Sequence, residues 1–353
     1  MRREFSPLRL QTRRPSDRLW GACLALSIWT LFAIYLAGYI GRFSSPSVNI
    51  VIAATNDTNY RWLKNVTIPN KRIIPYFADD QNATYHPLTN KGNEALVYLS
   101  YLYEHYDILP EISIFLHGHE RAWHHHALLE GSMLYTLNHL DLTEVFHRQY
   151  LNLHVDWPNA CPDWINTAWP FEDPIGKPEG PFMEEAFMAN FPGDPLPQFL
   201  NQPCCSQFAV TRKAIRSVPR EQYKQKIDWL LNVEMDNSLV GRIWEHMWQY
   251  LFLKKPVDCP IEYKALCRGW HICFENQEIF LEWNEIWHDI NGPLGMLVDE
   301  WRAEHYEPNA PTIGSIKRKM ARAQTNMREM KEAAIRRGSS RKERANLAWD
   351  LDL

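Results

Sequence analysis

The stretch Asn90–His126 constrains the fold most, because a helical pattern and a strand pattern follow each other in it directly. From Glu94 onward, apolar residues recur at steps of three and four, which is typical of an amphipathic helix: Ala95, Leu96, Leu99, Leu102, Tyr103 and Tyr106. Pro110 cannot continue this helix. The apolar, β-branched run Ile112–Leu116 then predicts a buried strand.

Further strand patterns lie on both sides of this stretch, at Val48–Ala54, Arg72–Phe77 and Gln207–Thr211. Helical patterns follow at Arg212–Arg216, at Pro219–Leu231 and, as one strongly amphipathic helix, at Gly241–Phe252. Strands that alternate with helices predict an α/β fold, in which helices flank a Rossmann-like, mostly parallel sheet. Ligands bind past the carboxyl ends of the strands in such sheets, which draws attention to His117-Gly118-His119.

The segment 19–41 carries no charged residue and is long enough, at about 1.5 Å per residue, to cross a hydrocarbon core of about 30 Å. It is too long for the apolar part of a signal peptide, and no small-residue cleavage site stands out. Arginines dominate the residues before it, so the positive-inside rule predicts a single-pass type II membrane protein.

Two further patterns agree with a lumenal domain in the Golgi or the endoplasmic reticulum. Asn56, Asn65 and Asn82 each begin an N-glycosylation triplet. Six cysteines follow the predicted anchor, an even number that favours disulfides in an oxidising compartment: Cys161, Cys204, Cys205, Cys259, Cys267 and Cys273. We expect the last three to close a C-terminal loop, although spacing alone does not fix the pairing.

These patterns divide the chain into a cytoplasmic tail (1–18), a transmembrane helix (19–41), a short stem (42–47), a lumenal α/β domain (48–300) and a basic, helix-prone tail (301–353). The net charge of −4 gives no indication of nucleic-acid binding. The basic tail is typical of a solvated segment, with contact to acidic lipid or a partner as the alternative. The irregular stretch 155–204 predicts a covering loop or a lid.

Histidines are the first candidates for chemistry. His117 and His119 lie two apart at a strand end, where both side chains can point to one side, and the loop that follows contains His124–His126. Imidazoles together with a carboxylate from Asp79, Asp80 or Glu120 would bind a divalent metal. The spacing matches no strong metal motif, so polar residues at a strand end and a solvated loop are the alternative.

Acidic residues are the second candidates. Asp79-Asp80 after a strand would bind ribose hydroxyls or a metal, whereas paired aspartates more commonly form a turn. Glu245, among aromatic residues on a helix, would serve as a general base if it faced a cleft, although glutamate on a helix is usually solvated. The sequence contains no P-loop, no glycine-rich dinucleotide motif and no nucleophile elbow.

Several blocks, in this order and spacing, resemble the mostly fungal family known as domain of unknown function 3431. They are 50–65 (IVIAATNDTNYRWLKN), 89–111 (TNKGNEALVYLSYLYEHYDILPE), 114–125 (IFLHGHERAWHH), 204–223 (CCSQFAVTRKAIRSVPREQY) and 241–252 (GRIWEHMWQYLF).

The layout of this family is similar to that of glycosyltransferases with a single Rossmann-like (glycosyltransferase A-like) domain. The resemblance implies that Ala53, Thr55 and Asp57 border a nucleotide, with Asp79 and Asp80 near the second strand's end. It also implies that His117-Gly118-His119 takes the place of an Asp-x-Asp metal motif, and that Glu245 is the base. The departure from Asp-x-Asp puts metal dependence in question.

Three hypotheses follow. The first is an anchored glycosyltransferase-like enzyme that takes a nucleotide-sugar donor and an unknown acceptor, in which Glu245 deprotonates the acceptor and His117 and His119 hold the diphosphate, directly or through a metal. The second is a metal-dependent tailoring enzyme of secondary metabolism that uses the histidine cluster. The third is a non-catalytic, membrane-anchored binding or assembly factor.

Overall fold

The computed structural model describes residues 29–30, 45–122, 124–158, 160–168, 176–291 and 311–346. The chain divides into two units, Met1–Pro46 and Ser47–Leu353, and the fold below is that of the second unit. The predicted cytoplasmic tail and transmembrane helix lie outside the described residues, apart from Trp29 and Thr30. Among the residues that are described, no helix is long and apolar enough to cross a membrane.

The strands of the described part form one five-stranded sheet in the order β2-β1-β3-β5-β4. Their bounds are β1 Val48–Ala54, β2 Lys71–Phe77, β3 Ile112–His117, β4 Tyr150–Asn152 and β5 Phe208–Thr211. Strand β1 pairs in parallel with β2 and β3, whereas β5 pairs antiparallel with β3 and β4. Four strands therefore point one way and β5 points the other.

The α/β prediction is confirmed, but the prediction of a mostly parallel sheet is wrong for the half formed by β3, β5 and β4. The physical reason is the connection 153–207. This connection leaves β4 at its carboxyl end and enters β5 beside that end, where the backbone N–H of Leu153 donates to the carbonyl of Gln207 at 2.8 Å. A strand that begins beside the carboxyl ends of its neighbours has to run in the opposite direction, so β5 is antiparallel to β3 and β4.

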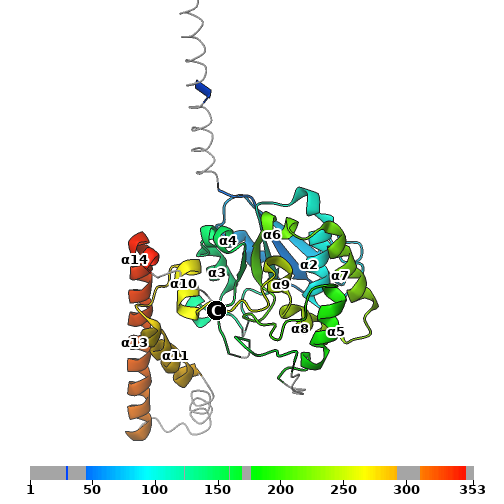
Figure 1. Ribbon diagram of the computed structural model, residues 1–353. Helices are drawn as coiled ribbons and strands as arrows, with labels where there is room; N and C mark the ends of the chain where they lie inside the picture. Colours follow the sequence, from blue (N-terminus) through cyan, green and yellow to red (C-terminus); the bar gives the residue numbers. More distant parts are fainter. Residues whose placement is uncertain are drawn as a thin grey trace, which may run out of the picture. The chain divides into compact units, whose positions relative to one another are not determined.

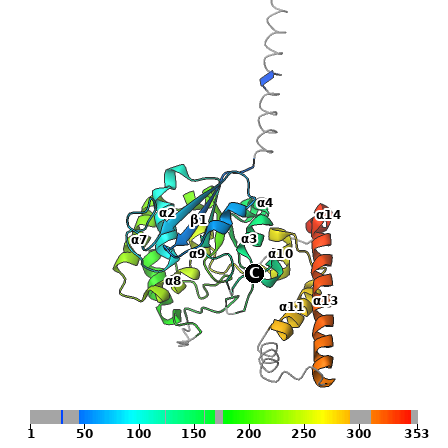
Figure 2. The same ribbon diagram turned by 180° about the vertical axis from the view of Figure 1, so that it is seen from behind.

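Helices cover both faces of the sheet, and successive β1 side chains point to opposite faces. Val51 joins the core under the first set of helices: α2 Glu94–Glu104, α5 Met183–Asn190, α6 Arg212–Arg216, α7 Arg220–Asn232, α8 Asn237–Glu245 and α9 Trp248–Leu253. Ile50 and Ile52 join the second core, under α3 Met133–Asn138, α4 Leu142–Arg148, α10 Glu262–Trp270, α11 Gln277–Asn291 and α13 Pro311–Ser339. Figures 1 and 2 show α2 and α7 on one side of the sheet and α3, α4 and α10 on the other.

The single helix predicted over Gly241–Phe252 is two helices, α8 and α9, so that prediction is wrong at its centre. The backbone tightens at the break, where the N–H groups of His246 and Met247 donate three residues back to Ile243 and Trp244. The freed carbonyl of His246 accepts from the side chain of Gln249 at 2.8 Å. This break places Glu245 at the carboxyl end of α8.

The basic C-terminal segment is helical, as predicted, but one side of α13 is packed. Ala334 is fully buried, and Trp283 of α11 donates its indole N–H to the carbonyl of Met327 at 3.1 Å. Gly338 lies so close to α10 that a Cβ would stand 1.7 Å from the carbonyl oxygen of His271. Figures 1 and 2 show α13 beside α11, with α14 (Arg341–Asn346) at its end. The interpretation as a solvated tail therefore holds only for the outer side of α13.

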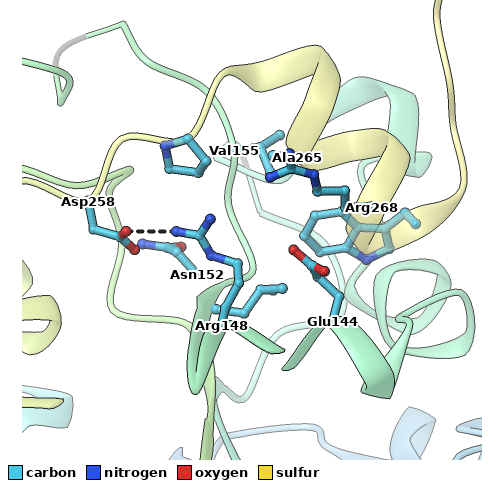
Figure 3. A pocket seen from close by; sticks show the side chains of 10 residues that line it. Glu144, Arg148, Asn152, Val155, Asp258, Ala265 and Arg268 are labelled. Atoms are coloured by element: carbon cyan, nitrogen blue, oxygen red, sulfur yellow. Dashed lines mark hydrogen bonds and ion pairs between the residues drawn. The ribbon is translucent and has the colours of Figure 1, made fainter. Parts of the chain in front are cut away.

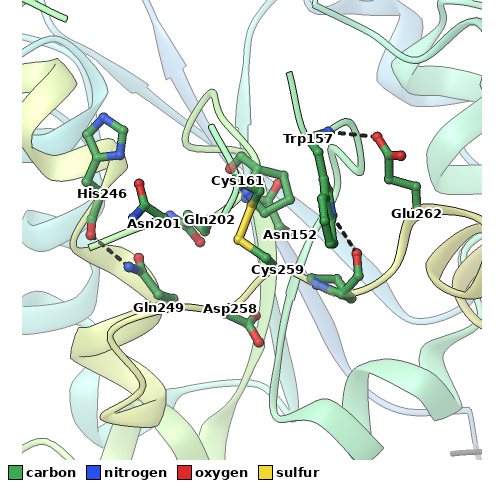
Figure 4. Close-up of a disulfide and its surroundings, with 12 residues drawn as sticks. Asn152, Trp157, Cys161, Asn201, Gln202, His246, Gln249, Asp258, Cys259 and Glu262 are labelled. Atoms are coloured by element: carbon green, nitrogen blue, oxygen red, sulfur yellow. Dashed lines mark hydrogen bonds between the residues drawn. A yellow bond between two sulfur atoms is a disulfide. The ribbon is translucent and has the colours of Figure 1, made fainter. Parts of the chain in front are cut away.

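The disulfide prediction is confirmed: among the described residues the bonds are Cys161–Cys259, Cys204–Cys205 and Cys267–Cys273. Only the third bond closes the C-terminal loop that was expected to include Cys259. Cys259 instead reaches 98 residues back to Cys161 (Figure 4). Beside this bond, Trp157 donates its backbone N–H to Glu262 and its indole N–H to the carbonyl of Pro260, both at 2.8 Å. The bond thus fixes the irregular loop 155–204 to the segment that leads into α10.

Loss of the long-range disulfide should destabilise the protein more than loss of the short-range one. Chain entropy predicts a cost of about 4.7 kcal/mol for the Cys161–Cys259 loop, against about 2.4 kcal/mol for Cys267–Cys273. We therefore expect Cys161→Ser with Cys259→Ser to lower the free energy of unfolding in urea by about 2 kcal/mol more than Cys267→Ser with Cys273→Ser. Equal losses in the two double variants would contradict this ranking.

Candidate active site

A cavity of about 690 Å³ lies at the edge of the sheet where β3 and β4 end and β5 begins. Residues from all three positions line it: His117 ends β3, His154 and Asp156 follow β4, and Cys204 and Cys205 precede β5. The chain crosses from one side of β1 to the other between β2 and β3, so the adjoining ends of β1 and β3 form a topological switch point, which the cavity meets through His117 of β3. Open α/β sheets bind ligands at this position.

Two carboxylates face the cavity from two helix ends. Glu94 is the first residue of α2 and Glu245 the last of α8. The Oε2 atom of Glu245 accepts from the backbone N–H of Cys205 at 3.1 Å. Burial, and after it the negative charge of Glu94, raise the pKa of Glu245 to about 7 against the opposing effects of His246, the Cys205 N–H and Arg242. Burial also raises the pKa of Glu94, against the opposing effect of hydrogen bonds from its own backbone N–H and from Ser206.

His117 lies beside this carboxylate pair. Its Nε2 atom is 3.8 Å from Oε2 of Glu94, beyond direct hydrogen-bond range, and that buried nitrogen has no hydrogen-bond partner among the described residues. Burial, with a smaller effect from His119, lowers the pKa of His117 to about 4, so the ring is neutral at pH 7. A ligand hydroxyl between the imidazole and the carboxylate would satisfy both groups.

Gln207 orients the neighbouring histidines. Its Oε1 atom accepts from the backbone N–H of His117 at 3.2 Å, so its amide NH₂ faces Nε2 of His124 at 3.1 Å. An amide NH₂ group only donates, and His124 therefore carries its proton on Nδ1 when neutral. Burial, together with the nearby His117 and His125, lowers the pKa of His124 to about 3. The ring thus presents no positive charge to the cavity at neutral pH.

Asp156 lies within ion-pair distance of two further imidazoles on the cavity wall. Its Oδ1 atom is 2.9 Å from Nε2 of His126 and its Oδ2 atom is 3.5 Å from Nε2 of His154. The Nδ1 atom of His126 accepts from the backbone N–H of Leu128 at 2.9 Å, so Nε2, the nitrogen nearer Asp156, carries a proton. Burial alone would raise the pKa of Asp156, but His126 and His154 outweigh it and hold the pKa at about 2.

Glu179 makes the third polar group of the cavity with Arg242 and His246. Its carboxylate accepts from Nε of Arg242 at 2.7 Å and lies 3.2 Å from Nε2 of His246. Burial opposes ionisation, but the hydrogen bonds from His246 and Arg242 lower the pKa of Glu179 to about 2. Arg242 also donates to the carbonyl of Gly176 at 2.6 Å, which fixes its guanidinium at the cavity.

The structure brings together two of the predicted site residues, His117 and Glu245, but His119 and Asp79 are exposed and are not among the residues that line the cavity. Gly118 between the histidines allows close packing, because a Cβ there would stand 1.9 Å from Cγ2 of Thr58. Of the two histidines only His117 lines the cavity, so the structure does not bring them together there as the metal pair that the spacing suggested. Among the described residues, no group of three or more His, Cys, Asp or Glu side chains could hold a metal ion.

The predicted nucleotide-binding residues form two linked turns beside the end of β1. The carboxylate of Asp79 accepts from the backbone N–H of Asn56 at 3.0 and 3.1 Å, and Asp80 accepts from the N–H of Asn82 at 2.9 Å. Thr55 donates its backbone N–H to the hydroxyl of Thr58 at 2.8 Å. These contacts agree with the turn interpretation of the paired aspartates. Like Asp79, the residues Ala53, Thr55, Asp57 and Asp80 are not among those that line the cavity.

The remaining predictions concern the glycosylation acceptors. The side chains of Asn56, Asn65 and Asn82 are exposed, as acceptors of N-linked glycans must be, and their glycosylation stays a prediction.

Sequence reasoning missed Glu94 as part of the site, along with Asp156, Glu179 and the adjacent cysteines. Glu94 marked only the start of the helical pattern in the sequence, and nothing in the spacing shows that it meets Glu245. The pair Cys204-Cys205 was the one available signal, because adjacent cysteines before a strand place both sulfurs at a strand end.

A second, much smaller cavity lies beside a buried ion pair (Figure 3). Its volume is about 20 Å³, enough for about one water molecule. Arg148 donates to Oδ1 of Asp258 at 2.7 Å, and both side chains are largely buried. This site joins α4 to the segment that precedes α10 and has no room for a substrate.

Comparison with known proteins gives the family. The model of the family described as "Protein of unknown function (DUF3431)" matches residues 50–268, more than half of the chain, so the chain belongs to this family. The match covers all of the sheet except the first two residues of β1, together with the carboxylate pair and the adjacent cysteines. No curated protein and no solved structure matches the chain.

Glu179→Gln should destabilise the protein by roughly 3 kcal/mol at pH 7, because it leaves Arg242 and His246 without their buried counter-charge. The folded-state pKa of about 2 lies below the ordinary value of 4.5, so this stabilisation is full above about pH 4.5 and is lost as the pH falls toward 2. Urea unfolding at several pH values should therefore show a gap between the two proteins that narrows in acid. The exposed Glu184→Gln is the matched control, and a gap of the same size for that variant would contradict the assignment.

Proposed function

We propose that this member of the DUF3431 family transfers a sugar from a nucleotide-sugar donor to a hydroxyl group of an acceptor, with Glu245 as the general base. The observation that carries the proposal is the buried carboxylate pair of Glu94 and Glu245 at the switch-point edge of the sheet. A perturbed carboxylate in a cleft at this position is a marker of catalysis.

The pKa of Glu245 suits this role. A value of about 7 leaves a large fraction of the group ionised at neutral pH and makes it a stronger base than an ordinary glutamate. In the proposed step the acceptor hydroxyl gives its proton to Glu245, and its oxygen bonds to the anomeric carbon. The bond from that carbon to the phosphate oxygen breaks, and the nucleoside diphosphate leaves with the electron pair.

The walls of the cavity suit a sugar. Trp164, Trp283 and Trp287 line it and offer indole faces for the apolar side of a sugar ring. The unpartnered Nε2 of His117, 3.8 Å from Glu94, is placed to hydrogen-bond a sugar hydroxyl. These groups support a role of His117 in binding the sugar, in place of the metal-ligand role suggested by its spacing from His119.

The charge of the cavity affects how the diphosphate of the donor can be bound. Its acidic lining residues are Glu94, Asp156, Glu179, Glu245 and Glu262, whereas Arg242 is its one lysine or arginine among the described lining residues. His126 and His154 contact Asp156, while Arg242 and His246 contact Glu179, so these groups are paired with carboxylates other than Glu94 and Glu245. Binding of a diphosphate would therefore require positive charge that the lining residues do not supply. Assays should accordingly be run both with and without a divalent cation.

We also propose that the enzyme is a single-pass type II protein of the Golgi or endoplasmic reticulum, anchored through residues 19–41. Three disulfides among the described residues support an oxidising compartment, and the exposed acceptor asparagines agree with a lumenal domain. A protease-protection assay on sealed microsomes would test this orientation, since cleavage of the 48–353 region without detergent would contradict it.

The direct test of the reaction is incubation of the full chain with a panel of nucleotide sugars, with and without Mn²⁺ or Mg²⁺, and detection of the released nucleoside diphosphate. We expect slow hydrolysis of at least one donor. If no donor is bound or hydrolysed under either condition, the glycosyltransferase proposal fails. Turnover of another substrate that stops when metal is removed would then favour the metal-dependent tailoring enzyme.

Glu245→Gln should lower kcat for the accepted donor by 100-fold or more, because it removes the proton acceptor and keeps the shape of the side chain. In the unmodified protein, kcat should rise with pH through about 7 as Glu245 loses its proton. Rates measured from pH 5 to 9 check both statements. Glu282→Gln, exposed on α11, is the control. Full activity of Glu245→Gln, or a rate that falls between pH 6 and 8, would contradict the assigned role.

A further inference from the structure

The disulfide between the adjacent residues Cys204 and Cys205 has no part in the reaction proposed above. Both cysteines line the cavity, at the end of the long connection that leads into β5. Two neighbouring residues joined in this way enclose their shared peptide in a small ring, which limits the conformations open to it. The bond therefore acts on the backbone at the edge of the site.

The backbone next to this ring is strained. Cys205 has a φ of +83° and Ser206 a φ of +46°, so two successive residues with side chains lie in the left-handed region. Each such residue costs about 1–3 kcal/mol and persists only where the surroundings enforce it. Without the ring, Cys205 would be free to return to an extended or right-handed conformation.

Cys205 and Ser206 also interact with the carboxylates of Glu245 and Glu94. Cys205 donates its backbone N–H to Oε2 of Glu245 at 3.1 Å. Ser206 accepts from the indole N–H of Trp248 at 3.1 Å, and its hydroxyl lowers the pKa of Glu94. The strained dipeptide thus acts on both members of the pair.

We propose that the Cys204–Cys205 disulfide is a redox-sensitive positioning device, which holds the Cys205 N–H on Glu245. Reduction by a dithiol breaks the S–S bond. The dithiol supplies two electrons and two protons, the two cysteines become thiols, and the reagent becomes a cyclic disulfide. The ring then opens, Cys205 leaves the left-handed region, and the hydrogen bond from its N–H to Glu245 is lost. The role of Glu245 as a general base rests on the proposed function, whereas the effect of the disulfide on the ionisation of Glu245 does not.

The physical consequence is a change in proton affinity. A hydrogen bond from a backbone N–H stabilises the charged form of a carboxylate, so its loss favours the protonated form. Glu245 should then hold its proton to higher pH. We expect a shift of about one pH unit, a tenfold change in proton affinity. A base that titrates higher is less ionised at neutral pH, so the reduced protein should be the less active form.

Carboxyl ¹³C NMR of the full chain, labelled at glutamate Cδ and studied without substrate, tests this. The resonance missing in Glu245→Gln identifies Glu245. Its titration midpoint should rise by about one unit in Cys204→Ala with Cys205→Ala, because the ring is gone. Cys204→Ala with Cys205→Gly should shift it by less than half as much, since glycine adopts positive φ at no steric cost. Cys267→Ser with Cys273→Ser, which removes the other short-range disulfide, should leave the midpoint unchanged.

Reduction and reoxidation of the unmodified protein give a second measurement if a variant fails to fold. The midpoint should rise with dithiothreitol and return after reoxidation. A midpoint that stays within 0.2 units in the reduced protein and in the alanine variant would overturn the proposal, as would equal shifts in the alanine and glycine variants. Because no substrate is present, this result is independent of whether any nucleotide sugar is turned over.

Discussion

The desolvation of two carboxylates that share one cavity is the constraint on which the site depends. Glu94 starts α2 and Glu245 ends α8, and no ion pair joins either of them to a lysine or arginine in the described part of the chain. Burial opposes the ionisation of both, and the charge of Glu94 opposes that of Glu245. The nearby His246 and Arg242 and the N–H of Cys205 favour an ionised Glu245, whereas the α2 backbone and Ser206 favour an ionised Glu94. The balance between these effects leaves Glu245 near neutrality, where a carboxylate is most useful as a base.

The architecture explains why the polar groups gather in one place. Strands β3 and β4 end at the edge where β5 begins, so three segments far apart in sequence deliver His117, Asp156 and Cys205 to one cavity. Helices α2 and α8, from the same face of the sheet, add the carboxylates. On the other face, α11 brings Trp283 to the cavity and is itself held by α13. Helix α13 therefore helps to fix the position of Trp283 in the cavity wall.

Sequence patterns predicted the elements well where periodicity was strong. The strand at Val48–Ala54 and the helix that begins at Glu94 lie where they were expected. Sequence patterns could not show the direction of β5, because that direction depends on the end of the sheet at which the chain re-enters it. They also could not show the break between α8 and α9, which depends on the tertiary contacts of His246 and Gln249.

The same limit applies to the site. His117 and Glu245 were identified from residue type and element ends, and the structure places both at the cavity. The pairing of His119 with His117 was suggested by alternation along a strand, but β3 ends at His117 and the chain turns at Gly118 against Thr58. Asp79 was suggested by its place after β2, yet its carboxylate serves the turn at Asn56. Glu94 was missed because its partner lies 151 residues away, a contact that only the fold reveals.

The most direct measurement is the titration of Glu245 in the Glu94→Gln variant, followed by carboxyl ¹³C NMR of the full chain. If the two carboxylates share one cavity, the unmodified protein should show a Glu245 midpoint near 7, and removal of the charge on Glu94 should lower it clearly. A midpoint near the ordinary value of 4.5 in the unmodified protein, or one that Glu94→Gln leaves unchanged, would contradict the account.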